Sequence, residues 1–171
     1  MELLAEAGPG ALTVTELCSR LGVTKGSFYH HFDGRPQFVG ELLDFWTHRQ
    51  STRLNEVSRS VDEAHERIAV LKRLAVNLPH DAEAAIRAWS SQDAAVAAAQ
   101  SRVDRLRHDH LKVAYREAGV PEERAEVLTT LAMSVLAGMQ MIVRPADPTL
   151  VGQVFDELEA AFFRADGTVR P

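Results

Sequence analysis

The chain has 171 residues, of which 46% are hydrophobic and 25% are charged, a composition typical of a soluble globular protein and not of a disordered one. This length allows one domain or two small ones and is sufficient for a sizeable core. A single cysteine, Cys18, excludes an internal disulfide and a cysteine-based zinc site. We find no leader and no apolar run of about 20 residues, so we expect a cytoplasmic protein without a membrane segment.

The formal net charge is −5, and the N-terminal part of the chain is acidic as well. Residues 1–44 contain three basic and six acidic side chains, a balance of −3. Any contact between this part and a polyanion must therefore depend on a few locally placed groups rather than on diffuse attraction.

After a short first helix that Gly8-Pro9-Gly10 ends, residues 13–32 predict two helices joined by a tight turn. Thr13 and Glu16 have the spacing of a capping box, in which each side chain accepts from the other residue's amide. One face of the first helix is apolar, formed by Val14, Leu17, Cys18 and Leu21. Gly22 is placed to end that helix in the left-handed conformation.

Thr24 is expected to cap the second helix of this pair, with Val23 and Phe28 packing together across its start. Phe28 and Phe32 share the inward face. The remaining face carries the charge and hydrogen-bonding groups that contact with DNA requires: Thr24, Lys25, Ser27, Tyr29 and His30. The alternative is an ordinary helical hairpin of an all-α protein.

The rest of the chain predicts further helices and no strands. A helix over 34–57 begins in the turn before Pro36 and continues into the larger part of the chain without a flexible linker, so the two parts are expected to move together. Later helices are expected near 61–78, around Ile86 and Trp89, and over 94–118, 121–143 and 148–165. The last two have wide apolar faces that suit a partner; alternatively, they complete the core of a monomer.

We find no motif for catalysis, for a cofactor or for a metal. His108 and His110 are two residues apart on a helix and point in different directions, so they cannot share a metal ion. His110 lies on an apolar stripe, which is typical of a core histidine that has a hydrogen-bond partner. We therefore expect no enzyme activity.

Residues 22–32, Gly-Val-Thr-Lys-Gly-Ser-Phe-Tyr-His-His-Phe, resemble the recognition helix of the TetR family of bacterial transcriptional regulators. Residues 11–14, Gly34-Arg35 and Phe38-Val39 fit the same pattern, and the similarity is specific over roughly residues 3–46. It implies DNA contacts from Thr13, Thr24, Lys25, Gly26, Ser27, Tyr29 and His30. Arg35 stands where the family usually has lysine and is expected to contact phosphate. Residues 1–8 resemble only the second half of the family's first helix, which suggests that this helix is truncated.

The resemblance also implies a helix-turn-helix domain over 1–44 that continues into an effector-binding and dimerisation domain over 45–171. It implies a homodimer through helices 121–143 and 148–165 that binds a palindromic operator. A weakly polar effector would lie within residues 45–143, with Trp89, His110, Met133 and Met139 as candidate lining residues. We expect a repressor that the effector releases by shifting helix 34–57. The alternative is a dimeric ligand-binding protein whose DNA binding is weak or absent.

Overall fold

The computed structural model describes residues 1–143 and 147–162, in which the regular structure is helical and no strand occurs. The elements are α1 (Glu2–Ala7), the 3-10 turn η1 (Pro9–Ala11), α2 (Val14–Leu21), α3 (Lys25–His31), α4 (Arg35–Ser60), α5 (Ala64–Val76), α6 (His80–Trp89), α7 (Ala94–Glu117), α8 (Glu122–Ile142) and α9 (Pro148–Phe162). The all-α prediction is confirmed.

Two helix ends differ from the sequence-based prediction. The helix predicted over 34–57 runs on to Ser60, so Val61 follows α4 instead of opening the next helix. That next helix begins at Ala64, because the Glu63 carboxylate accepts from the amide of His65 at 2.9 Å and from that of Glu66 at 2.5 Å. The last helix is described as far as Phe162, and the predicted residues 163–165 lie outside the described residues.

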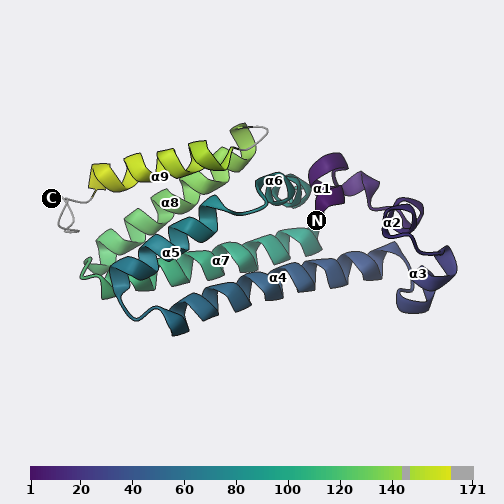
Figure 1. Ribbon diagram of the computed structural model, residues 1–171, viewed down its shortest axis with the longest axis horizontal. Helices are drawn as coiled ribbons and strands as arrows, with labels where there is room; N and C mark the ends of the chain where they lie inside the picture. The colour runs from purple at the N-terminus through teal and green to yellow at the C-terminus, as the bar shows by residue number, and fades with distance from the viewer. Residues whose placement is uncertain (144–146, 163–171) are drawn as a thin grey trace.

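The helices form an elongated molecule with two ends (Figure 1). One end contains α1, α2 and α3, and the other contains α5, α8 and α9. The long helices α4 and α7 pack against each other, and α6 lies between the two ends, where it contacts α1. Because α4 belongs to both ends, a displacement at one end is transmitted along a continuous helix.

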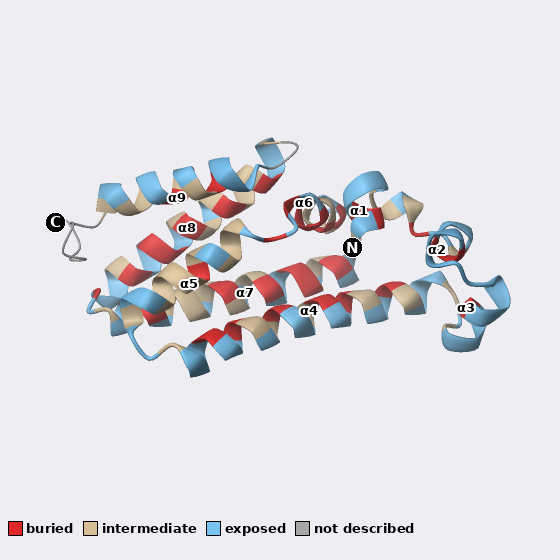
Figure 2. Ribbon diagram, viewed as in Figure 1, coloured by how far each residue is buried: buried red, intermediate tan, exposed pale blue. Residues whose placement is uncertain are grey.

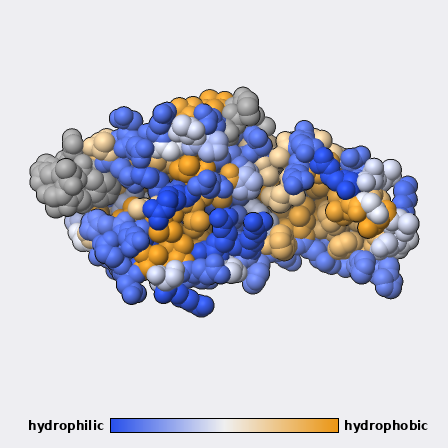
Figure 3. Space-filling view, viewed as in Figure 1, coloured by the Kyte–Doolittle hydropathy of each residue, from blue (hydrophilic) through white to orange (hydrophobic). Residues whose placement is uncertain are grey.

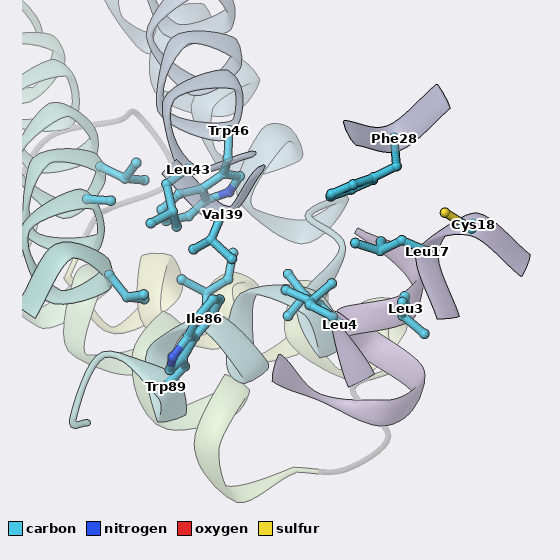
Figure 4. Close-up of a cluster of buried hydrophobic side chains, with 14 residues drawn as sticks. Leu3, Leu4, Leu17, Cys18, Phe28, Val39, Leu43, Trp46, Ile86 and Trp89 are labelled. Atoms are coloured by element: carbon cyan, nitrogen blue, oxygen red, sulfur yellow. The ribbon is translucent and has the colours of Figure 1, made fainter. Parts of the chain in front are cut away.

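A single cluster of buried apolar side chains joins the N-terminal helices to the larger part of the chain (Figure 4). Phe28 and Leu4 come from the small helices, Trp46 comes from α4, and Ile86 comes from α6; each is at most 4% exposed. Apolar burial contributes about 25 cal/mol per Å², so separating the two ends would be costly. The boundary between the proposed domains 1–44 and 45–171 therefore crosses a shared core.

The predicted apolar face of α2 is wrong at its last position. Leu17 and Cys18 are buried, but Leu21 is 64% exposed. Leu21 is the final residue of α2, and the chain turns at Gly22 directly after it, where φ is 66°. Helical spacing places a side chain on one face of a helix, but burial also requires a neighbouring element at the same position along the helix axis.

By length and composition, α8 could cross a membrane, which differs from our expectation that no such segment exists. One third of its 18-residue apolar window is buried inside the protein. A single helix of this kind is weak evidence for a membrane span, because core helices of globular proteins have the same properties.

Candidate nucleic-acid interface and interior cavity

The pair α2 and α3 is fixed by local caps. The Thr13 hydroxyl accepts from the Glu16 amide at 3.2 Å, as predicted. The reciprocal half of the capping box is absent, because the Thr13 amide donates to the Ala11 carbonyl at 2.7 Å instead. At the other end of α2, the Val23 amide donates to the Cys18 carbonyl at 3.0 Å, which closes the turn around left-handed Gly22.

Aromatic packing orients α3. The Thr24 hydroxyl accepts from the Ser27 amide at 3.1 Å and so starts the helix as predicted. Phe28 is 4% exposed, and its ring centroid lies 5.1 Å from that of Phe32 and 5.9 Å from that of Phe38 on α4. Val23, expected to pack on Phe28, is 40% exposed. With the phenyl face inward, the opposite face of α3 points to solvent.

The residues predicted to contact DNA are all exposed. Tyr29 is 58% exposed although it adjoins buried Phe28, and its ring meets that of Phe28 edge-on at 5.6 Å. Lys25 forms no ion pair with any described residue. The exposed set is Thr13, Thr24, Lys25, Gly26, Ser27, Tyr29, His30 and Arg35.

The structure gives Arg35 contacts within the protein that the sequence did not indicate. Its Nε donates to the Leu12 carbonyl at 2.9 Å, and its Nη2 donates to the Pro9 carbonyl at 3.1 Å. Its guanidinium carbon lies 6.0 Å from the ring centroid of Trp89. The side chain therefore ties the start of α4 to η1 and α6.

Replacing Arg35 with alanine is expected to lower the free energy of unfolding by about 1 kcal/mol, because two carbonyl oxygens lose their charged donor. Urea unfolding measures the change. Arg49→Ala, on an exposed position of the same helix, is the control and should stay within about 0.5 kcal/mol of the unmodified protein. Equal stability of the two variants would contradict the structural role assigned to Arg35.

A cavity of about 80 Å³ lies among α4, α5, α7, α8 and α9. Its wall is largely aliphatic and aromatic, with Leu54, Leu71, Leu111, Leu128, Leu136 and Phe155 among the lining residues. Apolar side chains also reach the surface between charged ones over this end of the molecule (Figure 3). An apolar lining of this kind suits a small apolar molecule.

Of the four residues predicted to contact an effector, Met133 lines this cavity. Trp89 lies in the other cluster, with Trp46 and Ile86, and Met139 packs against the cluster that contains Leu136 and Phe155. His110 Nδ1 lies 2.9 Å from the Ser58 hydroxyl of α4. Burial lowers the pKa of His110, and the nearby Asp109 carboxylate partly opposes this effect.

A buried polar network links the cavity to the shared core. The Glu83 side chain is fully buried, and its Oε1 accepts from Trp46 Nε1 at 3.0 Å and from Gln50 Nε2 at 3.4 Å. Its Oε2 lies 2.9 Å from Nη1 of Arg107, which is 8% exposed. Gln50 and Arg107 line the cavity, whereas Trp46 belongs to the core around α3. One carboxylate thus contacts a side chain of the shared core, Trp46, and two side chains that line the cavity, Gln50 and Arg107.

The sequence did not lead us to this network, although it contained a signal for it. Gln50 follows Trp46 by four residues, and Arg107 follows Val103 by four, so both polar residues continue apolar stripes. A polar residue on such a stripe usually needs a buried partner of complementary chemistry. Which partner it meets depends on helix packing that spacing alone does not give.

The geometry defines a class of protein: an all-α fold with an exposed helix-turn-helix at one end and a helical bundle enclosing a cavity at the other. Comparison with known families narrows this class, because residues 1–42 match the model for bacterial regulatory proteins of the tetR family. Residues 1–42 thus have the N-terminal domain of the tetR family of bacterial regulatory proteins.

Two individual proteins are similar to this chain. The HTH-type transcriptional repressor KstR2 of Rhodococcus jostii (strain RHA1) is 44% identical over 41 residues, which are 24% of this chain and 20% of that protein. The matched stretch thus spans about a fifth of this curated relative. A proposed transcriptional regulator from Saccharomonospora viridis, solved in complex with choline, has a TM-score of 0.78 at 16% identity and covers 92% of this chain and 90% of its own. At this identity the likeness concerns the fold.

Proposed function

We propose that the protein is a homodimeric, ligand-responsive transcriptional repressor that acts in the cytoplasm and has no catalytic role. The observation that carries this proposal is the two-sided α3, with Phe28 buried in the core and a polar face exposed. The tetR family match over the same residues and the similarity to a repressor support it.

The DNA contacts are assigned to Thr13, Thr24, Lys25, Gly26, Ser27, Tyr29 and His30. Of the three basic side chains in residues 1–44, Arg20 pairs with Glu6, and Arg35 donates to two carbonyls. Lys25 is therefore the main positive charge available to phosphate from this end, and the phosphate contact predicted for Arg35 is kept as part of the proposal. In an acidic domain, removing one such local charge has a large relative effect on DNA affinity.

Lys25→Ala is expected to weaken operator binding and to reduce the slope of log affinity against log salt by about 1 for each phosphate that is no longer neutralised, or about 2 for a dimer. Fluorescence anisotropy against the DNA upstream of the gene, over a salt series, measures both quantities. Lys112→Ala, on α7, is the control, because Lys112 pairs with Glu122 and Glu126. An unchanged slope in Lys25→Ala would remove Lys25 from the DNA contacts.

A second candidate function is a dimeric ligand-binding protein with weak DNA binding. The formal charge of −3 on residues 1–44 favours it. The same titration separates the two functions. Steep salt dependence with sequence preference supports the repressor, whereas no binding at low salt supports the ligand-binding protein.

Dimerisation is assigned to α8 and α9, the helices predicted over 121–143 and 148–165. Large apolar side chains are exposed on both: Val127, Met141 and Ile142 of α8 are 54%, 47% and 83% exposed, and Leu150 of α9 is 38% exposed. Most of the outward surface of α9 is also exposed (Figure 2). A dimer would place two copies of α3 at the spacing of about 34 Å that two half-sites of a palindromic operator require.

Val127→Glu is expected to shift the protein toward monomer, because the interface would have to bury an unpaired carboxylate. Sedimentation velocity at several concentrations measures the change. Val113→Glu on α7 is the matched control, since Val113 is 43% exposed but lies outside α8 and α9. If both variants sediment as the unmodified protein does, the interface lies elsewhere.

Effector response is assigned to the cavity and to α4. Gln50 lines the cavity, and Trp46, one turn earlier on α4, contacts the core around α3; both donate to Glu83. An effector that moves Arg107 or Gln50 changes the contacts that hold α4. The free energy for the shift must come from a difference in effector affinity between the two states. The structural neighbour was solved in complex with choline, which supports the binding of a small molecule by a protein of this fold.

A further inference from the structure

The cavity combines an apolar wall with a buried guanidinium. Arg107 is 8% exposed and reaches the cavity from α7. Its Nη1 lies 2.9 Å from Glu83 Oε2, which makes an ion pair, although this contact does not have the geometry of a hydrogen bond. Its Nη2 is buried and has no hydrogen-bond partner within residues 1–143 and 147–162. A guanidinium has a planar set of donors suited to a carboxylate, and here part of that set is unused.

The other charged side chains at the cavity do not supply the missing acceptor. Glu159 lines the cavity, but Lys72 Nζ donates to it at 2.5 Å and to Asp156 at 2.9 Å. Arg53 also lines the cavity and forms no ion pair with a described residue. The lining therefore offers more unpaired donors than acceptors, which favours an anionic group over a cationic one.

We propose that this cavity binds an apolar molecule with one carboxylate, and that the carboxylate accepts from Nη2 of Arg107. The class is that of medium-chain monocarboxylic acids, with the hydrocarbon among the leucine and phenylalanine side chains. The proposal deepens the proposed function, on which it rests for its regulatory meaning, by naming the chemistry of the effector. A volume of about 80 Å³ holds only part of a medium-chain acid, so the binding of such an acid requires the helices around the cavity to separate.

Octanoate, 1-octanol and octyltrimethylammonium are the probes, because they share one hydrocarbon chain and differ in the polar group. Isothermal titration calorimetry with the full chain and without DNA measures each affinity. Octanoate is expected to bind at least tenfold more tightly than 1-octanol, and the cation is expected to bind more weakly than either. Equal binding of the acid and the alcohol, or tighter binding of the cation, would overturn the proposal.

A matched variant tests the role of Arg107. Arg107→Met is combined with Glu83→Gln, so that no buried carboxylate is left without a partner. The double variant is expected to lose at least tenfold in octanoate affinity while its 1-octanol affinity is retained. Arg105→Met, on an exposed position of α7 outside the cavity lining, is the control and should bind octanoate unchanged. Full octanoate affinity in the double variant would contradict the proposal.

A measurement on the unmodified protein covers the case in which the double variant fails to fold. Octanoate labelled with ¹³C at its carboxyl carbon is titrated by NMR in the complex. The guanidinium is expected to lower the pKa of the bound carboxyl below that of free octanoate. A pKa that is unchanged or raised in the complex overturns the assignment.

These outcomes are separate from those of the proposed function. If octanoate binds as expected but leaves operator affinity unchanged, the ligand class stands and the release mechanism is wrong. If octanoate shows no preference over the alcohol while the protein still binds its operator, the ligand class is wrong and the DNA-binding assignment stands.

Discussion

Replacing Arg107 alone with methionine is expected to lower the free energy of unfolding by about 3–5 kcal/mol, because it leaves the carboxylate of fully buried Glu83 without its ion-pair partner. Urea unfolding followed by circular dichroism measures the change. The surface pair of Arg102 and Asp44, whose charged atoms are 3.9 Å apart, supplies the control: Arg102→Met should cost less than about 1 kcal/mol.

A double-mutant cycle measures the interaction energy between Arg107 and Glu83 separately from the contacts that each makes with other residues. In Arg107→Met with Glu83→Gln, the buried charge is gone and an amide oxygen can still accept from Trp46, so most of the stability should return. The coupling energy is expected to exceed about 1 kcal/mol. Strictly additive effects of the two substitutions would mean that the buried pair contributes no interaction.

Replacing Phe28 with alanine is expected to cost about 3–5 kcal/mol and to abolish operator binding. Phe28 is 4% exposed, and its ring contacts Phe32 and Phe38, so its removal leaves a cavity that lets α3 change orientation relative to α4. Thermal unfolding and fluorescence anisotropy together measure the two effects.

Tyr29→Ala is the matched comparison for Phe28→Ala, because the two aromatic residues are neighbours on one helix but Tyr29 is 58% exposed. This variant should keep its stability within about 0.5 kcal/mol and bind DNA more weakly. If instead Tyr29→Ala unfolds as readily as Phe28→Ala, the exposed face of α3 has a structural role that we have not assigned. If Phe28→Ala retains operator binding, the aromatic packing does not orient α3.

The sequence predicted the local structure of the N-terminal end well, because that structure is set by nearby residues. Thr13 and Thr24 cap the helices that their spacing indicated, and Gly22 ends α2 in the left-handed conformation. Bonds to more distant segments could not be predicted in this way. The Arg35 guanidinium donates to the carbonyls of Pro9 and Leu12, which its sequence position did not indicate, and its contact with phosphate stays a prediction.

The cavity was harder to predict, because its lining comes from five helices whose mutual rotation is not encoded in any one of them. Met133 was expected to line a cavity on the basis of its residue type, and it does so. Trp89, which is equally suitable by type, packs instead in the cluster that contains Trp46 and Ile86. The ion pair of Glu83 and Arg107 was not predicted, because it can be recognised only when the packing of α6 against α7 is known.

Because α4 is a long continuous helix, a small tilt near its middle displaces its distant end by a larger distance. Fifteen residues separate Gln50 from Arg35, a length of about 22 Å at 1.5 Å per residue. If α4 tilts by about 5° around its contact with Glu83, the end that adjoins α3 moves by about 2 Å. This displacement exceeds the range of about 0.5 Å in donor–acceptor distance over which hydrogen bonds to base edges form. Small atomic adjustments at the cavity would thus be amplified over the length of the helix into a mismatch with DNA.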